Sequence, residues 1–221
     1  AWYADHRINL THSQKATALD TQKKVVTLGS GEEIAYGKLL LAVGTCARKW
    51  TVPGADKEGV LYVRTLDDAK KVIAAVKSAK QAVVVGGGFI GFEMCDMLRL
   101  AGINTTLVIR EKYFWEPLLD EQSGRIIEAA LKKGGVKILY TSLVEEVTGS
   151  THVEGVRLID GTTLPADMIM AGVGTQCDLD WIKAAGIACG TGVLTDEFLE
   201  TSAKDVFAAG DVAEYQDVLL E

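Results

Sequence analysis

The central feature of this 221-residue sequence is the run Gln81-Ala-Val-Val-Val-Gly-Gly-Gly-Phe-Ile-Gly-Phe-Glu93. The apolar residues Ala82 to Val85 predict a buried strand, and the segment from about Phe89 to Ala101 predicts a helix. Between them the glycines have the spacing Gly-x-Gly-x-x-Gly. A strand, a glycine-rich turn and a helix in this order are typical of a dinucleotide-binding unit. A second predicted strand, Asn104 to Ile109, favours this interpretation over a merely tight turn.

Each glycine of this turn has a separate expected role. We expect Gly86 to let the chain turn sharply, Gly88 to leave room for a pyrophosphate, and Gly91 to let the helix pack closely on the strand. The helix N-terminus offers unpaired N–H groups and a partial positive charge to phosphates. The predicted contacts of the pyrophosphate are Gly86, Gly87, Gly88, Phe89, Ile90 and Gly91.

The composition is that of an ordinary soluble globular protein, with 48% hydrophobic and 24% charged residues. The formal net charge of −7 argues against a nucleic-acid partner. The longest apolar runs, such as Leu39 to Val43, are too short to span a bilayer, so we expect no membrane partner. The cysteines are scattered without metal-ligand spacing, which predicts structural thiols in a reducing, cytoplasmic compartment and no metal site. They are Cys46, Cys95, Cys177 and Cys189.

Strands and helices alternate through the rest of the chain. Thr65 and Asp120 are predicted helix N-caps, and Glu128 with Lys132 forms an i,i+4 pair. Strands are predicted at 6–11, 16–20, 38–43, 136–140, 168–173 and 206–209, hairpins at 24–35 and around 160–161, and a short helix at 179–185.

Two stretches of the chain match at a constant offset of 130 residues. The apolar residues and glycines from Val26 to Thr45 coincide with those from Val156 to Thr175, and both stretches end in Val-Gly-Thr. Ile8 to Leu10 can be placed on Val136 to Ile138 at an offset of 128. We interpret this as two copies of one nucleotide-binding unit, against the alternative that any two hairpin-plus-strand units look alike. The glycine turn of the first copy is expected before Ala1, in a longer protein.

With these motifs the chain resembles the two-dinucleotide-binding-domain flavoprotein reductases of the pyridine nucleotide-disulfide oxidoreductase superfamily. Within it, the ferredoxin or rubredoxin reductase and apoptosis-inducing-factor branch is most similar. Val43 stands where the family usually has Thr. The motifs that match are Leu39 to Thr45 followed by Pro53-Gly54, Gly86 to Glu93, Gly172 to Thr175, and Thr201 to Asp211.

The resemblance implies an α/β fold in which a Rossmann-like NAD(P)-binding domain is inserted in a partial, related FAD-binding domain. The implied limits are 1–66 and 188–221 for the FAD-binding domain and 67–187 for the complete NAD(P)-binding domain. Glu93 is the implied catalytic residue, approaching the nicotinamide and flavin; otherwise it is a carboxylate that stabilises the helix N-terminus. Gly174 and Thr175 are implied on the nicotinamide side. The implied FAD contacts are Gly44, Thr45, Gly210 and Asp211, of which Asp211 would bond the ribityl chain.

The second strand ends where the 2′ position of the cofactor is read, which predicts contacts from Ile109, Arg110 and Glu111. Ile109 stands where NADH-using relatives usually carry an acid that accepts the 2′-hydroxyl. Arg110 favours the 2′-phosphate of NADPH, Glu111 opposes it, and Gly91 in place of Ala favours NAD. The sequence therefore does not decide between NADH and NADPH as the cofactor. The aromatic run Tyr113 to Trp115 either covers the bound dinucleotide or packs on its domain.

The implied reaction passes a hydride from NAD(P)H to FAD, with a small electron carrier such as ferredoxin or rubredoxin as partner. A homodimer of the full-length protein is a further possibility. One alternative is a dinucleotide-binding sensor or interaction module without turnover. Another keeps the superfamily but changes the acceptor to a disulfide, a persulfide, oxygen or a nitrite-reducing domain.

Overall fold

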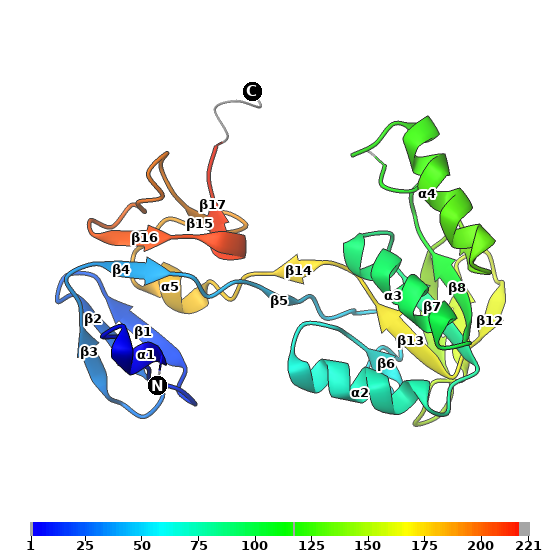
Figure 1. The fold of residues 1–221 in the computed structure, drawn as a ribbon, viewed down its shortest axis with the longest axis horizontal. Helices are drawn as coiled ribbons and strands as arrows, with labels where there is room; N and C mark the ends of the chain where they lie inside the picture. Colours follow the sequence, from blue (N-terminus) through cyan, green and yellow to red (C-terminus); the bar gives the residue numbers. More distant parts are fainter. Residues whose placement is uncertain (1, 117, 217–221) are drawn as a thin grey trace. The chain divides into compact units, whose positions relative to one another are not determined.

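The computed structural model describes residues 2–116 and 118–216, which fold into two compact units (Figure 1). We call them the outer unit, Ala1–Cys46 with Gln176–Glu221, and the inserted unit, Ala47–Thr175. The chain leaves the outer unit, completes the inserted unit and returns. This confirms the α/β class and the insertion of one domain in another. The predicted limits 1–66, 67–187 and 188–221 divide the chain by the cofactor that each segment binds. The compact units divide it by packing, at other positions, so the functional limits stay predictions.

A five-stranded parallel sheet in the order β6-β13-β7-β8-β9 forms the centre of the inserted unit. Its strands are β6 (Val60–Leu61), β7 (Gln81–Val85), β8 (Asn104–Val108), β9 (Lys137–Leu139) and β13 (Met168–Ala171). The helices of this unit are α2 (Leu66–Val76), α3 (Phe89–Leu100) and α4 (Glu121–Lys133). Parallel sheets are covered on both faces, which explains why these strands are largely apolar.

Successive residues of each strand point to opposite faces of the parallel sheet. Val84 and Leu107 belong to a core that includes Cys95 and other residues of the three helices. Val83 and Val108 belong to a second core, shared with a three-stranded antiparallel sheet. The inserted unit therefore has three layers: helices, parallel sheet and antiparallel sheet (Figure 1).

The two copies inferred from the sequence appear as two separate three-stranded sheets. They are β1 (Ala16–Asp20), β2 (Val25–Leu28) and β3 (Glu33–Ala35), and β10 (Val144–Thr148), β11 (Gly155–Leu158) and β12 (Thr163–Pro165). Both pair in sequence order, and each first strand has one irregularity, between Ala16 and Ala18 and between Val144 and Glu146. The paired residues correspond at offsets of 128 and 130 throughout. A shared bulge is a conserved structural device, so it supports duplication more strongly than the hydrophobic pattern does.

The core of the outer unit lies around two parallel strand pairs. These are β4 (Leu39–Leu41) with β16 (Val206–Ala208), and β15 (Val193–Leu194) with β17 (Ala213–Glu214); the unit also has α1 (Trp2–Asp5), α5 (Asp180–Ala184) and the 3₁₀ helix η1 (Gly210–Val212). Where the chain passes between the units, β5 (Cys46–Ala47) pairs with β14 (Thr175–Gln176). None of the helices in the described segments has the length and apolar composition that a membrane span requires.

The predicted helix N-termini are confirmed in detail. Thr65 Oγ1 accepts a hydrogen bond from Asp68 N at 3.1 Å, and the Asp68 carboxylate accepts one from Thr65 N at 2.9 Å, which completes a capping box. Asp120 Oδ1 likewise accepts from Ser123 N at 2.7 Å. The predicted ion pair between Glu128 and Lys132 is also present.

The predicted strand at 6–11 is wrong. After α1 this segment turns at Arg7, which has a left-handed backbone (φ 55°), and residues 8–11 then pair with no strand among the described residues. The offset of 128 that places Ile8 to Leu10 on Val136 to Ile138 is also the offset between β1 and β10, but only the second of these segments forms a strand, at Lys137–Leu139. The strand predicted at 38–43 shortens to β4, and Leu40 and Val43 are more than half exposed.

Gly91 sets how closely α3 approaches β7. A Cβ built there would overlap the carbonyl oxygen of Gly86 and lie 3.7 Å from Val84 Cγ1. We expect Gly91→Ala to lower the free energy of unfolding by about 1–3 kcal/mol, the usual cost of overpacking. Urea denaturation followed by circular dichroism measures this change.

Gly88→Ala is the matched control for this substitution. A Cβ at Gly88 meets no atom within 4 Å, and its φ of −76° suits any residue. We expect a change within about 0.5 kcal/mol, as at other open positions. Equal losses in the two variants would contradict the close approach at Gly91.

Candidate functional site

A cleft of about 570 Å³ opens in the inserted unit where β7, β8 and β13 end. Residues 86–88 after β7, 109–111 after β8 and 172–174 after β13 all line it. Ligands of open parallel sheets bind outside the carboxyl ends of the strands. Three motifs that lie far apart in the sequence therefore meet at the position where this fold offers a site.

The glycine turn at the base of the cleft is held by backbone contacts on two sides. Gly86 has a φ of +102°, a conformation that favours glycine. Its N–H donates to Val108 O at 3.0 Å, and a Cβ built on it would overlap the carbonyl oxygen of Gly172. The turn is thus fixed between the ends of β8 and β13, and any side chain at position 86 would displace it.

The start of α3 offers open N–H groups to the cleft. Gly88 is the N-cap and makes no side-chain cap, and the helix begins with the hydrogen bond from Phe92 N to Gly88 O at 3.0 Å. The first N–H groups of a helix have no partner within it and carry a partial positive charge. Because a Cβ at Gly88 would meet no atom within 4 Å, the space before these groups is free. This geometry fits the diphosphate of a dinucleotide.

The three residues after β8 differ in what they offer a ligand. The Ile109 side chain is buried in the helix-side core and lies 3.0 Å from a Cβ built at Gly87, so it contributes only an apolar surface. Arg110 Nε donates to Glu111 Oε1 at 2.9 Å. The Arg110 side chain is 78% exposed and that of Glu111 is 24% exposed. The rim of the cleft therefore carries a guanidinium and a carboxylate that pair with each other.

Aromatic residues form a further wall. Trp115 lines the cleft, and its ring lies 4.7 Å from that of Phe89 and 5.9 Å from that of Phe92. Phe114 is fully buried in the core. The sequence left open whether this aromatic run covers a bound dinucleotide or packs on its domain. Phe114 packs inside the domain, whereas Trp115 faces the cleft. Trp115 also has a φ of 61°, which is uncommon for a bulky residue.

Sequence reasoning missed part of the lining, in particular Arg48 and Trp50. Arg48 N donates to Gly174 O at 3.0 Å, and its Nη2 donates to Thr175 O at 3.3 Å. These bonds hold the segment that follows β13. The partners lie 127 residues apart in the chain, so no local pattern marks them.

Other predicted residues lie beside the cleft. Phe89 and Ile90 are exposed in the first turn of α3. Glu93 is exposed one turn further along α3 and is outside the cleft lining. Thr175 is exposed in β14, directly after the lining residue Gly174. Their contacts with a cofactor stay predictions.

The outer unit brings two other sequence motifs together. β4 and β16 are parallel neighbours, and Ala209 N donates to Leu41 O at 3.0 Å, so the motifs that follow them leave the sheet side by side. Thr45 Oγ1 donates to Asp211 Oδ2 at 3.4 Å. Gly44 and Gly210 have φ values of 63° and 74°. The four predicted FAD contacts of this chain therefore lie at the carboxyl ends of one strand pair.

All four cysteines are free thiols. Burial raises the pKa of the Cys95 thiol to about 12. Burial also raises the pKa of Cys177, whose Sγ lies 3.7 Å from Asp211 O, and that of Cys189. Cys46 is exposed, and its Sγ lies 3.3 Å from Gln176 O.

Comparison with known proteins relates this geometry to established families. A family model described as pyridine nucleotide-disulphide oxidoreductase matches residues 3–219. The NADH-rubredoxin oxidoreductase of Clostridium acetobutylicum is 35% identical over 214 residues, covering 97% of this chain and 52% of that protein. The nitrite reductase [NAD(P)H] of Bacillus subtilis is 30% identical over 217 residues, covering 98% of this chain and 27% of that protein.

A solved structure shows the same fold. The ferredoxin reductase of Rhodopseudomonas palustris that serves a CYP199A2 system superimposes with a TM-score of 0.95 at 30% identity. The match covers 99% of this chain and 54% of that one. The chain thus spans about half, or less, of the proteins it matches.

The cysteine environments predict an order of alkylation. The thiolate is the reactive form, and with a pKa of about 12 only about one Cys95 thiol in 10,000 is ionised at pH 8. We expect iodoacetamide to label exposed Cys46 first and to label Cys95 only after unfolding in urea, as read by mass spectrometry. Cys46→Ser should remove the fast phase. Rapid labelling of Cys95 in the folded chain would refute the buried position.

Proposed function

Because the chain belongs to the pyridine nucleotide-disulphide oxidoreductase family, we propose that its protein passes a hydride from NAD(P)H to FAD and electrons on to a redox partner. Members of this family use FAD and NAD(P)H. One observation supports the proposal above all others: residues 86–88, 109–111 and 172–174 converge on one cleft before an open helix N-terminus.

In this proposal the inserted unit holds the pyridine nucleotide, within the functional limits 67–187. The N–H groups at the start of α3 bind the diphosphate, and the absent side chain at Gly88 lets it approach. Ile109, Arg110 and Glu111 contact the adenosine ribose, and Gly174 with Thr175 lies on the nicotinamide side. The bonds from Arg48 keep that last segment in place.

In this proposal the FAD-binding segments 1–66 and 188–221 hold the flavin, and its contacts lie in the outer unit. The contacts we propose are Gly44, Thr45, Gly210 and Asp211, which already lie together at one sheet edge. The nicotinamide and the flavin supply the hydride chemistry, and the protein supplies binding and orientation. Glu93 is the proposed catalytic carboxylate, exposed on the helix that begins at the diphosphate site.

For the acceptor we propose a small electron carrier such as ferredoxin or rubredoxin. The names of two relatives support this choice, a NADH-rubredoxin oxidoreductase and a ferredoxin reductase. A nitrite-reducing domain is the second candidate, because the Bacillus subtilis relative is a nitrite reductase. We place the protein in the cytoplasm, because its four cysteines are free and reducing compartments keep thiols unpaired.

Gly88→Asp tests the diphosphate site without disturbing the fold. Asp is a good N-cap, so its carboxylate should satisfy the N–H groups of α3 and repel phosphates. We expect NADH affinity to fall by at least about a hundredfold, because the new carboxylate repels the diphosphate and also occupies the N–H groups that would bind it. Isothermal titration measures the affinity, and dye reduction by the full-length protein should fall in parallel. Gly88→Ala, which adds a Cβ where the diphosphate approaches but adds no charge, should weaken binding less than Gly88→Asp does; unchanged binding by Gly88→Asp would refute the site.

Two substitutions test how the 2′ position is read. If Arg110 binds a 2′-phosphate, Arg110→Ala should weaken NADPH about tenfold, the loss of one charged hydrogen bond, and leave NADH nearly unchanged. Glu111→Gln should strengthen NADPH, because it removes a repulsive charge and frees the guanidinium. Lys112→Ala is the matched control, an exposed cation outside the cleft lining. Equal losses of NADH and NADPH in Arg110→Ala would show that Arg110 does not discriminate between them.

A further inference from the structure

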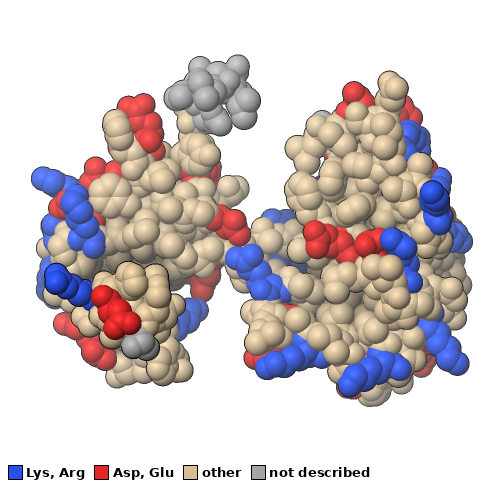
Figure 2. All heavy atoms as spheres, viewed as in Figure 1, with Lys and Arg blue, Asp and Glu red and all other residues tan. Residues whose placement is uncertain are grey.

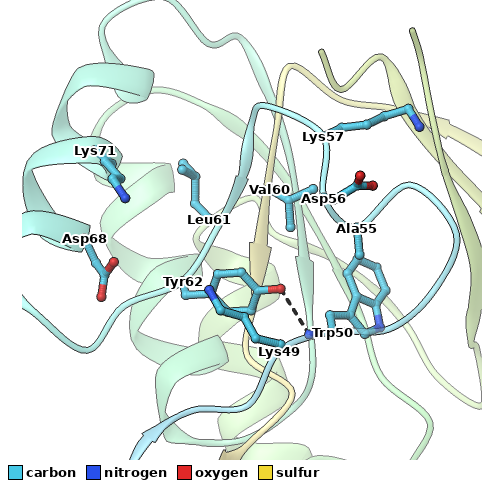
Figure 3. Close-up of a pocket in the computed structure, with 10 residues that line it drawn as sticks. All are labelled: Lys49, Trp50, Ala55, Asp56, Lys57, Val60, Leu61, Tyr62, Asp68 and Lys71. Atoms are coloured by element: carbon cyan, nitrogen blue, oxygen red, sulfur yellow. Dashed lines mark hydrogen bonds between the residues drawn. The ribbon is translucent and has the colours of Figure 1, made fainter. Parts of the chain in front are cut away.

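A second cavity of about 420 Å³ lies in the inserted unit, and residues 86–88 of the glycine turn are not among those that line it (Figure 3). Its walls are the connection that follows β5, the edge strand β6 and the first half of α2. Trp50 is the residue that lines both this cavity and the dinucleotide cleft. Its volume falls in the range of small-molecule sites, about 300–1,000 Å³.

The aromatic wall of this cavity is fixed before any ligand enters. Trp50 N donates to the Tyr62 hydroxyl at 3.1 Å, and Lys49 Nζ lies 4.5 Å from the centre of the Tyr62 ring. Val147 N also donates to Pro53 O at 2.9 Å, which holds the turn next to the cavity on β10. The indole, the phenol and the apolar side chains of β6 therefore form a preorganised surface for a flat ring.

The charges around the cavity favour an anion. Lys49, Lys57 and Lys71 line it with Asp56 and Asp68, and Figure 2 shows basic side chains gathered over α2. The Asp68 carboxylate is engaged at the N-terminus of α2, where hydrogen bonds from the Thr65 N–H keep its pKa low. In the described part of the chain, neither Lys49 nor Lys71 forms a salt bridge, although the charge of Lys71 contributes to the low pKa of Asp68.

The three lysines are not equivalent. Figure 3 shows the ammonium groups of Lys49 and Lys71 on the Asp68 side of the cavity, with Lys57 pointing away from both. A Cβ built at Gly54 would lie 2.8 Å from Lys57 Nζ, so this group lies over the turn at Gly54. Two cations beside an aromatic wall are the complement of one anionic group on a flat ring.

We propose that this cavity binds a small aromatic anion, a flat ring that carries one carboxylate or phosphate group. The ring lies against Trp50, and the anionic group lies between Lys49 and Lys71. Since Trp50 also lines the dinucleotide cleft, the ligand would sit across one side chain from the cofactor site.

Titration of the chain with phenyl phosphate and with benzoate tests the proposal, and the two arms distinguish phosphate from carboxylate. We expect saturable binding of one equivalent of at least one probe, and none of neutral benzyl alcohol. Lys49→Met and Lys71→Met should each weaken binding about tenfold, the loss of one charge-assisted hydrogen bond. Lys57→Met, the matched control, should leave binding unchanged, with thermal unfolding confirming that all variants fold.

Gly88→Asp separates this cavity from the glycine turn. Binding of the probe should persist in this variant, because Gly88 is not among the residues that line this cavity. Loss of probe binding in Gly88→Asp would place the anion at the helix N-terminus and overturn the proposal. Probe binding that does not saturate up to about 10 mM would also overturn the proposal, because a specific site should bind more tightly. Equal binding of benzyl alcohol, or equal losses of probe binding in all three lysine variants, would overturn it as well.

Discussion

The inserted unit depends on a close approach of backbone to backbone at three glycines. Gly91 lies against the carbonyl oxygen of Gly86, and Gly86 lies against that of Gly172. Side chains at these contacts would meet backbone atoms, which cannot rotate away as side-chain atoms can. The approach brings the first turn of α3 over the end of β7 and directs its N–H groups at open space. The packing that stabilises the fold thus also creates the site that we propose for the diphosphate.

The same construction occurs twice in the chain. The sheets β1-β2-β3 and β10-β11-β12 share strand order, pairing and the position of one bulge. Each copy also places a glycine of positive φ after its following strand, Gly44 with 63° and Gly174 with 103°. A bulge changes the twist of a strand, so its retention in both copies indicates that it orients the segments that follow. Duplication of one scaffold therefore provides two similar sheet edges, one in each unit.

Local patterns predicted the parts of the structure that local forces determine. The glycine turn, the caps at Thr65 and Asp120 and the hairpins depend on neighbouring residues, and the sequence predicts them correctly. The segment 6–11 has a strand-like alternation, but it finds no partner strand among the described residues. Arg48 reaches its site through bonds to residues 174 and 175, a pairing that only the folded chain creates. Sequence motifs therefore predict local geometry well, and they miss side chains such as that of Arg48, which come from another segment of the chain.

Cofactor preference is the property that such motifs determine least. The Ile109 side chain is committed to the core, so the position that carries an acid in NADH-using members of the resembled family offers only hydrocarbon here. In the function we propose, recognition of the 2′ group then falls to Arg110 and Glu111, whose charges pair on the rim. An exposed pair of this kind contributes at most about 1 kcal/mol, so a 2′-phosphate can separate it at little cost. A 2′-hydroxyl can instead donate to Glu111 with the pair intact. Under this proposal, discrimination between NADH and NADPH depends on the balance of two neighbouring charges rather than on a single residue of the motif.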